Sequence, residues 1–291
     1  MRVVATHFTD PGCPWAYSAR PWHAKLSWRF GDQLDWRLVM IGLAESPERY
    51  ESRGYTPEKQ VAGFRGFAER FGMPFAYEPK ARIAATSRAC RAIVAAREQS
   101  PVAAEAALRA LQFLQFATAD RLDDDDALRR ALADVDGLDA DAIVARIDAP
   151  ELIAAYEQDR ALTRSAEGGP TDVQGRAAQS DGPIRYTAPS VIFTAEGGAS
   201  MEVGGFQPFE AYDTALANLA PELERRAEPE GPAEVLAAFP DGLTTAEVAW
   251  VRKTNLRRLD LAGTRAALEE LAGSGAARRT PLGDDALWHA G

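Results

Sequence analysis

Cys13 is the side chain of this sequence best placed to do chemistry, within the sequence Cys-Pro-Trp-Ala at residues 13–16. Residues 3–8 have the apolar pattern of a strand, residues 9–12 form a turn, and a helix is predicted directly behind Cys13. The free amides and the dipole at a helix N-terminus stabilise an anion. We therefore predict that Cys13 is a nucleophilic thiolate; the alternative is a small apolar side chain buried in a turn.

The next three residues are the candidate partners of this sulfur. Pro14 has no amide hydrogen, so the backbone N–H groups of Trp15 and Ala16 are the nearest donors. Lowering a thiol pKa by two units requires about 2.7 kcal/mol, whereas a helix N-terminus supplies up to ~2 kcal/mol, so direct hydrogen bonds must provide the rest. The Trp15 side chain is predicted either to cover the sulfur and contact a substrate or to serve packing alone.

Few other residues could bind a metal or take part in redox chemistry. Cys90 lies in the middle of a predicted helix, where an inert buried thiol is favoured over a distant resolving thiol. Two cysteines make neither a disulfide framework nor a zinc cluster, and His7, His23 and His289 lack the spacing of metal ligands. We expect no metal, and we assign no role to His7, which could lie in the core beneath Cys13.

Composition and charge narrow the class of protein. The 291 residues are 46% hydrophobic and 26% charged, which is typical of a soluble globular chain. The net charge of −10 suits non-specific nucleic-acid binding poorly. No apolar run approaches the ~20 residues of a membrane span, and the N-terminus has no features of a secretory signal. We expect a cytoplasmic protein with neither a membrane nor a nucleic acid as its partner.

The order of predicted elements indicates an α/β fold. Strand, helix and strand up to residue 41 form a βαβ unit with parallel strands, and residues 46–180 are predicted as a large all-α insertion. Strand character returns in a hairpin at 188–205, where Pro189 marks an edge, a strand start or a cis turn. A helix follows from about residue 208 to residue 219.

The C-terminal part is predicted as a separate unit. Residues 223–234 have the composition of a linker, and residues 235–291 contain two helices and a hairpin, the pattern of a winged helix. A surplus of basic residues between 244 and 283 could support contact with DNA. Packing or dimerisation is favoured, because the whole chain would repel phosphates.

Three segments, in this order, resemble the DsbA-like thioredoxin-fold family, in the cytosolic branch of FrnE-type oxidoreductases and 2-hydroxychromene-2-carboxylate isomerases. Residues 10–15 resemble the active-site turn, residues 187–193 the cis-proline loop, and residues 203–208 the last strand and the cap of the final helix. The resemblance covers residues 1–222. It implies a thioredoxin-like fold with a helical insertion and a cis peptide bond before Pro189.

The resemblance also implies an activity. Cys13, Pro14, Trp15 and Pro189 would be the catalytic residues, and Ala188, Trp15 and Ala16 would contact a bound thiol. Ala16 stands where family oxidoreductases often carry a second cysteine, so the local resolving thiol is missing.

We therefore expect a thiol-dependent oxidoreductase or thiol transferase that acts through one cysteine. It would hold no tightly bound cofactor, and its partner would be a protein disulfide or a small thiol such as glutathione or mycothiol. Two alternatives are a glutathione- or mycothiol-dependent isomerase or transferase of small electrophiles, and a non-enzymatic redox- or DNA-linked regulator. The sequence does not decide whether the protein forms a homodimer.

Overall fold

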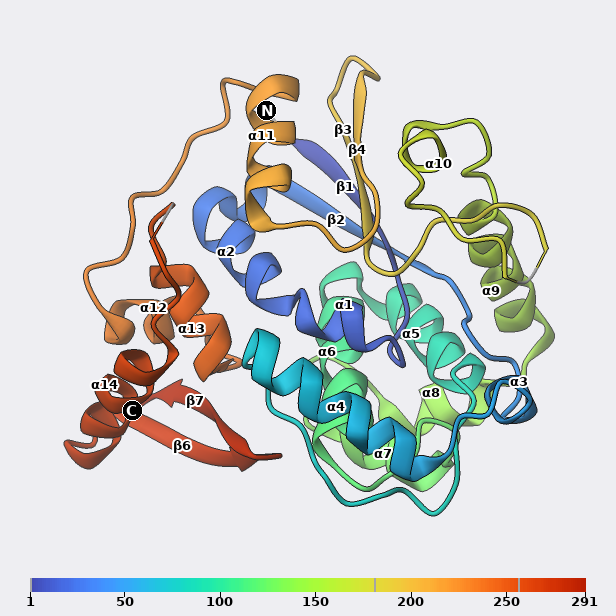
Figure 1. Cartoon of the computed structure of the whole chain (residues 1–291), viewed down its shortest axis with the longest axis horizontal. Helices are drawn as coiled ribbons and strands as arrows, with labels where there is room; N and C mark the ends of the chain where they lie inside the picture. The colour runs from blue at the N-terminus through green and yellow to red at the C-terminus, as the bar shows by residue number, and fades with distance from the viewer. Residues whose placement is uncertain (1, 181, 256) are drawn as a thin grey trace.

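The computed structural model describes residues 2–180, 182–255 and 257–291, and a mixed four-stranded sheet lies at its centre (Figure 1). The strand order is β2-β1-β3-β4, with β1 Val3–Thr9, β2 Leu34–Met40, β3 Ser190–Thr194 and β4 Ser200–Val203. β1 and β2 are parallel, whereas β3 runs antiparallel to both β1 and β4. The predicted βαβ unit and the later hairpin are confirmed.

Two long helices pack on one side of this sheet. α1 (Pro14–Ser18), α2 (Arg20–Phe30) and the short 3₁₀ helix η1 (Gly31–Gln33) connect β1 to β2, and α11 (Phe209–Leu219) follows β4. The apolar cluster between helices and sheet includes Leu26, Phe193 and Leu216, all fully buried. The arrangement is that of a thioredoxin-like fold, as predicted.

The chain between β2 and β3 forms the predicted helical insertion. Its helices are α3 (Glu48–Glu51), α4 (Pro57–Phe71), α5 (Ser87–Gln99), α6 (Pro101–Ala117), α7 (Asp125–Ala133), α8 (Ala140–Arg146), α9 (Pro150–Thr163) and α10 (Pro170–Val173). Local sequence sets several starts, because the Thr56, Ser100 and Asp124 side chains each accept a hydrogen bond from a first-turn amide.

The insertion also covers the open edge of the sheet. Asp159 of α9 accepts a hydrogen bond from the backbone amide of Met40 at 2.9 Å, and Arg97 of α5 donates one to the carbonyl of Leu38 at 2.6 Å. Arg97 and Asp159 form an ion pair with each other at 3.0 Å. Strand β2 therefore presents paired backbone groups, which protects an edge that could otherwise pair with another chain.

The C-terminal part is a small unit of helices and a sheet. It contains α12 (Pro232–Ala238), β5 (Leu243–Thr244), α13 (Thr245–Arg252), α14 (Leu261–Gly273), β6 (Ala277–Leu282) and β7 (Asp285–Ala290), with strand order β5-β7-β6. The predicted helices and hairpin are present. α12 begins inside the predicted linker 223–234, because Pro232 suits a first helical position. The winged-helix assignment and the domain boundaries stay predictions.

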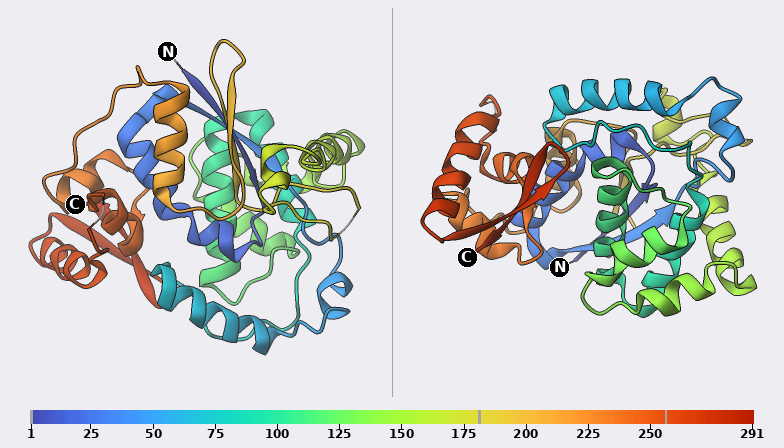
Figure 2. Two further views of the ribbon diagram at one scale, coloured as in Figure 1. Left: turned by 45° about the horizontal axis from the view of Figure 1, so that its top comes forward. Right: turned by 90° about the horizontal axis from the view of Figure 1, so that it is seen from below.

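This unit packs directly against α2 (Figure 2). Ala24 and Trp28 of α2 belong to the same apolar cluster as Val248 and Trp288. An ionic cluster adds to the contact: the carboxylate of Glu247, 1% exposed, pairs with Arg20 of α2 at 3.5 Å and with Arg109 of α6 at 2.9 Å.

The turn between β6 and β7 makes a second connection, to the segment that follows α4. Asp284 accepts hydrogen bonds from the amide of Phe75 at 2.8 Å and the hydroxyl of Tyr77 at 2.7 Å. Gly283 has φ +53°, and a Cβ there would lie 2.8 Å from the Phe75 backbone, so only glycine fits. The C-terminal unit thus contacts both the thioredoxin-like part and the helical insertion.

Candidate functional site

Strand β1 delivers Cys13 to the start of α1, as predicted. The strand ends at Thr9, and a turn closes when the amide of Cys13 donates a hydrogen bond to the carbonyl of Asp10 at 3.1 Å. Cys13 is the N-cap residue of α1, with extended backbone angles (φ −88°, ψ 114°), and Pro14 occupies the first helical position. The thiol therefore lies at the helix N-terminus.

The cis-proline loop faces this thiol. β3 pairs antiparallel with β1 in a register that sets Ser190 opposite Phe8, so the start of β3 lies beside the end of β1. The Ala188–Pro189 peptide bond just before β3 is cis, which confirms that expectation. The Cys13 thiol donates a hydrogen bond to the carbonyl of Ala188 at 3.4 Å. Cys13, Ala188 and Pro189, distant in sequence, are together in the structure.

Trp15 packs against other aromatic rings, one of its two predicted roles, and its contact with a substrate stays a prediction. Its ring packs edge-on against Phe67 and Phe71 of α4 and against Phe206, at centroid distances of 4.9, 6.0 and 5.0 Å. It nevertheless remains 39% exposed. Figure 1 shows α4 running beside α1, so an aromatic surface adjoins the thiol. The sequence analysis missed α4 as part of the site, although its apolar residues at helical spacing were the available signal.

The prediction that Cys13 rests as a thiolate is wrong for this structure. Burial raises the pKa of Cys13 to about 12, and the neighbouring charge of Asp10 adds to the rise. The backbone amides of Ala16 and Trp15, the predicted donors, lower the pKa but do not outweigh burial. The side chain is only 6% exposed, and removing an anion from water costs more than one helix terminus returns. The resting thiol is therefore protonated.

The side chain of Asp10 holds the active-site turn in place, a role that the sequence alone did not indicate. Its buried carboxylate accepts hydrogen bonds from the Gly12 amide at 2.8 Å, the Leu43 amide at 2.8 Å and the Thr86 hydroxyl at 3.1 Å. Burial raises the pKa of this carboxyl, and these donors lower it. Asp10 thereby ties the active-site turn to the segment after β2 and to the cap of α5.

Cys90 lies in α5 and is fully buried. Its thiol donates a hydrogen bond to Asp10 at 3.5 Å, and burial raises its pKa well above the ordinary value. Both cysteines are free thiols. These surroundings agree with the interpretation of Cys90 as an inert thiol.

His7 lies with His23 and Trp36 in the interior. The two imidazole centroids are 4.4 Å apart, and the Trp36 ring lies 4.9 Å from His23. Burial lowers the pKa of His7 well below its usual value and that of His23 to about 3, so both rings are neutral at physiological pH. Within residues 2–180, 182–255 and 257–291, no group of three or more His, Cys, Asp or Glu side chains is arranged to hold a metal ion.

The helices of the same ranges do not combine the length and the apolar character that crossing a bilayer requires.

Comparisons with known proteins agree with this fold. The chain is 26% identical over 246 residues to the ClpXP adapter protein SpxH of Shouchella clausii (strain KSM-K16), covering 84% of this chain and 75% of that protein. Cytosolic disulfide reductase DsbM from Pseudomonas aeruginosa, also solved with GSH, has a TM-score of 0.52 at 20% identity, covering 75% of this chain and all of that one.

A structure described as a probable DsbA oxidoreductase, from Streptomyces coelicolor, has a TM-score of 0.55 at 21% identity and covers 79% of this chain and 93% of that one. At these identities the structures show the fold, and the narrower FrnE-type or isomerase branch stays a prediction. A family model, the DSBA-like thioredoxin domain, matches residues 5–178. Since this match spans more than half of the chain, the protein belongs to the DsbA-like thioredoxin domain family.

Proposed function

We propose that this protein is a thiol-dependent oxidoreductase or thiol transferase in which Cys13 is the single nucleophile. The observation that carries the proposal is the position of the Cys13 sulfur, at the start of α1 and 3.4 Å from the carbonyl of Ala188 in the cis-proline loop. A substrate thiol or peptide would pair with the backbone of Ala188 and lie against the exposed part of Trp15.

The chemistry is a disulfide exchange in two steps. The Cys13 thiolate attacks one sulfur of a substrate disulfide, forms a mixed disulfide with it and releases the other sulfur as a thiolate. Ala16 offers no second thiol, and Cys90 is buried against Asp10. A small thiol such as glutathione or mycothiol therefore attacks the mixed disulfide, takes up the bound sulfur and frees Cys13.

The proposed reaction requires the sulfur to lose its proton. With a pKa of about 12 the resting thiol is almost wholly protonated at neutral pH. Substrate binding must therefore expose Cys13 to water or to polar groups of the substrate, after which the amides of Trp15 and Ala16 stabilise the anion. The structure of the cytosolic disulfide reductase DsbM with GSH supports the choice of a small thiol as the second reactant. The isomerase or transferase alternative uses the same sulfur position, with the small thiol as bound co-substrate.

A second candidate is a non-catalytic protein-binding role. SpxH of Shouchella clausii, to which the chain is 26% identical, is named an adapter protein, and the protonated, 6% exposed thiol favours a site that is not used for chemistry. Trp15, Phe67 and Phe71 would then belong to the partner surface. The DNA-linked alternative has no relative of this kind in its favour.

Mass spectrometry after exposure to oxidised glutathione, and separately to oxidised mycothiol, tests the proposal. We expect one adduct per chain on Cys13, lost in Cys13→Ser and retained in the matched control Cys90→Ser. A bond between Cys13 and Cys90 would overturn the single-cysteine mechanism. The second candidate would be favoured instead by two results together: no adduct up to pH 9, and binding of a protein partner that is as strong in Cys13→Ser as in the unaltered protein.

A further inference from the structure

A pocket of about 530 Å³ lies where the three parts of the chain meet. Its lining comes from β2 and α2 of the thioredoxin-like part, from the first half of α6, and from residues 238–243 and Glu247 of the C-terminal unit. Its volume is within the range of small-molecule sites. Cys13, Trp15 and Ala188 do not line it.

The walls of this junction pocket are largely apolar. Leu34 and Trp36 line one side, Val102 and Ala106 of α6 another, and Phe239 contributes from the C-terminal unit. Val102 is 81% exposed, so its side chain is open to contact with a ligand. Such walls suit the apolar body of a ligand.

Two polar atoms among the lining residues lack a partner. Oε1 of Glu105 and Nε2 of His23 are buried, and neither has a hydrogen bond within the chain. Leaving a buried polar group without a hydrogen bond costs about 1–3 kcal/mol, which a ligand that donates hydrogen bonds would recover. Because His23 is neutral, its Nε2 accepts a hydrogen bond in the tautomer protonated at Nδ1.

The charge of the lining favours a cation. Five acidic residues stand against three arginines, and Glu247 is already engaged by Arg20 and Arg109. Asp35 pairs with Arg37 at 3.1 Å, so Asp32, Glu105 and Asp241 stand against Arg2, beside the cluster of Glu247 with its two arginines. An ammonium group would therefore meet complementary charge, and Trp36 offers it an aromatic face.

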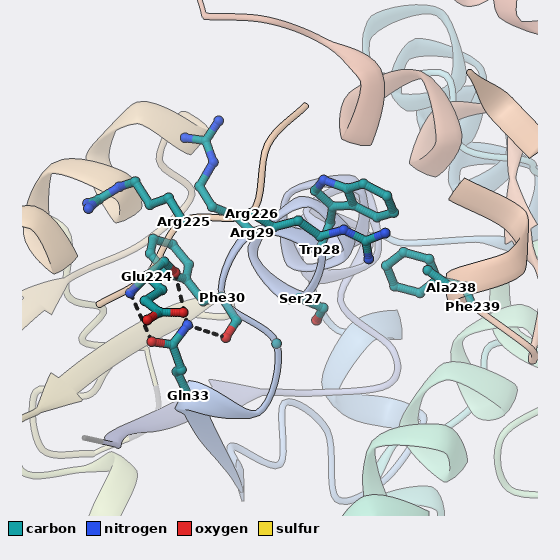
Figure 3. A pocket seen from close by; sticks show the side chains of 11 residues that line it. Ser27, Trp28, Arg29, Phe30, Gln33, Glu224, Arg225, Arg226, Ala238 and Phe239 are labelled. Carbon is teal, nitrogen blue, oxygen red and sulfur yellow. Dashed lines mark hydrogen bonds between the residues drawn. The ribbon is translucent and has the colours of Figure 1, made fainter. Parts of the chain in front are cut away.

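The neighbouring pocket differs in this respect (Figure 3). It measures about 600 Å³, shares Ser27, Ala238 and Phe239 with the first, and is lined by three arginines. Each arginine already has a carboxylate partner: Arg29 pairs with Glu228 and Asp213, Arg225 with Asp213, and Arg226 with Glu234. Arg226 also stacks on Trp28 at 3.4 Å. The three arginines of this second pocket are thus paired within the chain, and we propose no ligand for it.

We propose that the junction pocket binds a small amphipathic primary amine, with the ammonium group against Glu105 and His23 and the apolar body against Trp36 and Val102. The ammonium donates to the two unpartnered atoms, and its charge offsets that of the carboxylates. This site is independent of the thiol chemistry of Cys13. A bound amine would also join α6 to the C-terminal unit, because both line the pocket.

Isothermal titration calorimetry of the full chain tests the proposal with three phenylethyl probes that differ in charge. We expect phenethylamine to bind saturably at one site, and 3-phenylpropionate, which replaces the ammonium by a carboxylate, to bind at least tenfold more weakly. The neutral 2-phenylethanol should lie between them. An absence of saturable binding by phenethylamine at millimolar concentration, or equal binding of the anion, would overturn it.

Variants locate the site. Glu105→Gln should weaken phenethylamine binding about tenfold, whereas Glu269→Gln, the same change on the exposed face of α14, should leave it unaltered. Val102 is exposed, so Val102→Lys should not disturb the fold. This variant should also weaken phenethylamine binding, because it places a second positive charge beside the pocket. Cys13→Ser should have no effect. Unchanged affinity in both Glu105→Gln and Val102→Lys would refute this placement.

Discussion

Alkylation of Cys13 should remain slow at neutral pH and should accelerate far into the alkaline range. Burial shifts the pKa of this thiol from 9.0 to about 12, a difference of three units. Only the thiolate reacts, so at any pH well below 9 the reactive fraction is about a thousandfold smaller than that of an unperturbed thiol. The folded protein should therefore react about a thousandfold more slowly than the chain unfolded in urea.

The assay follows the Cys13 peptide by mass spectrometry during reaction with iodoacetamide between pH 7 and pH 11. The rate in the folded protein should rise about tenfold per pH unit and should continue to rise above pH 9, where the rate of the unfolded chain levels off. Cys90, fully buried, serves as the internal control and should react no faster than Cys13.

A plateau of the Cys13 rate below pH 8 would refute this reasoning. It would show that the amides and the helix dipole outweigh burial, and that the anion is held at rest. The same raised pKa predicts the sign of a stability change: the folded state keeps the proton longer than the unfolded chain, so stability falls as pH rises from about 9 towards 12.

Three further predictions concern the packing of the parts and the missing second thiol. Glu247→Gln leaves two largely buried arginines without their carboxylate and should lower the free energy of unfolding by about 3 kcal/mol, measured by urea titration against Glu269→Gln as control. Asp284→Ala removes two hydrogen bonds to the segment behind α4 and should cost about 1–3 kcal/mol in the same titration; an unchanged midpoint would contradict the proposed anchoring. Ala16→Cys introduces a second thiol at the fourth position of the motif, so thiol counting should detect an internal disulfide with Cys13 after oxidation, and dithiol oxidase activity should appear with a reduced dithiol peptide as substrate. Failure of this variant to form that disulfide would mean that the turn geometry differs from that of a dithiol site.

Local features of the sequence were enough to predict most elements. The predicted strand before Cys13 and the helix that follows it are both present, and each depends on residues close together in the chain. The helix starts at Thr56 and Ser100 and the capping box at Thr244 are equally local, since each cap bonds to an amide three positions away. The cis bond before Pro189 followed from a resemblance rather than from spacing, since no local rule separates it from a strand start.

What only the tertiary structure decided depends on groups far apart in the chain. The sequence of residues 10–16 places Cys13 at a helix N-terminus and so predicts an anion, but the protonation state is set by how many water molecules the packed chain removes. Asp10 looked like a turn residue, and its contacts with Leu43 and Thr86 exist because β2 and α5 pack against that turn. The junction pocket likewise requires α6 and the C-terminal unit to meet at β2, since burial and unmade hydrogen bonds are properties of the assembled volume and have no counterpart in residue order.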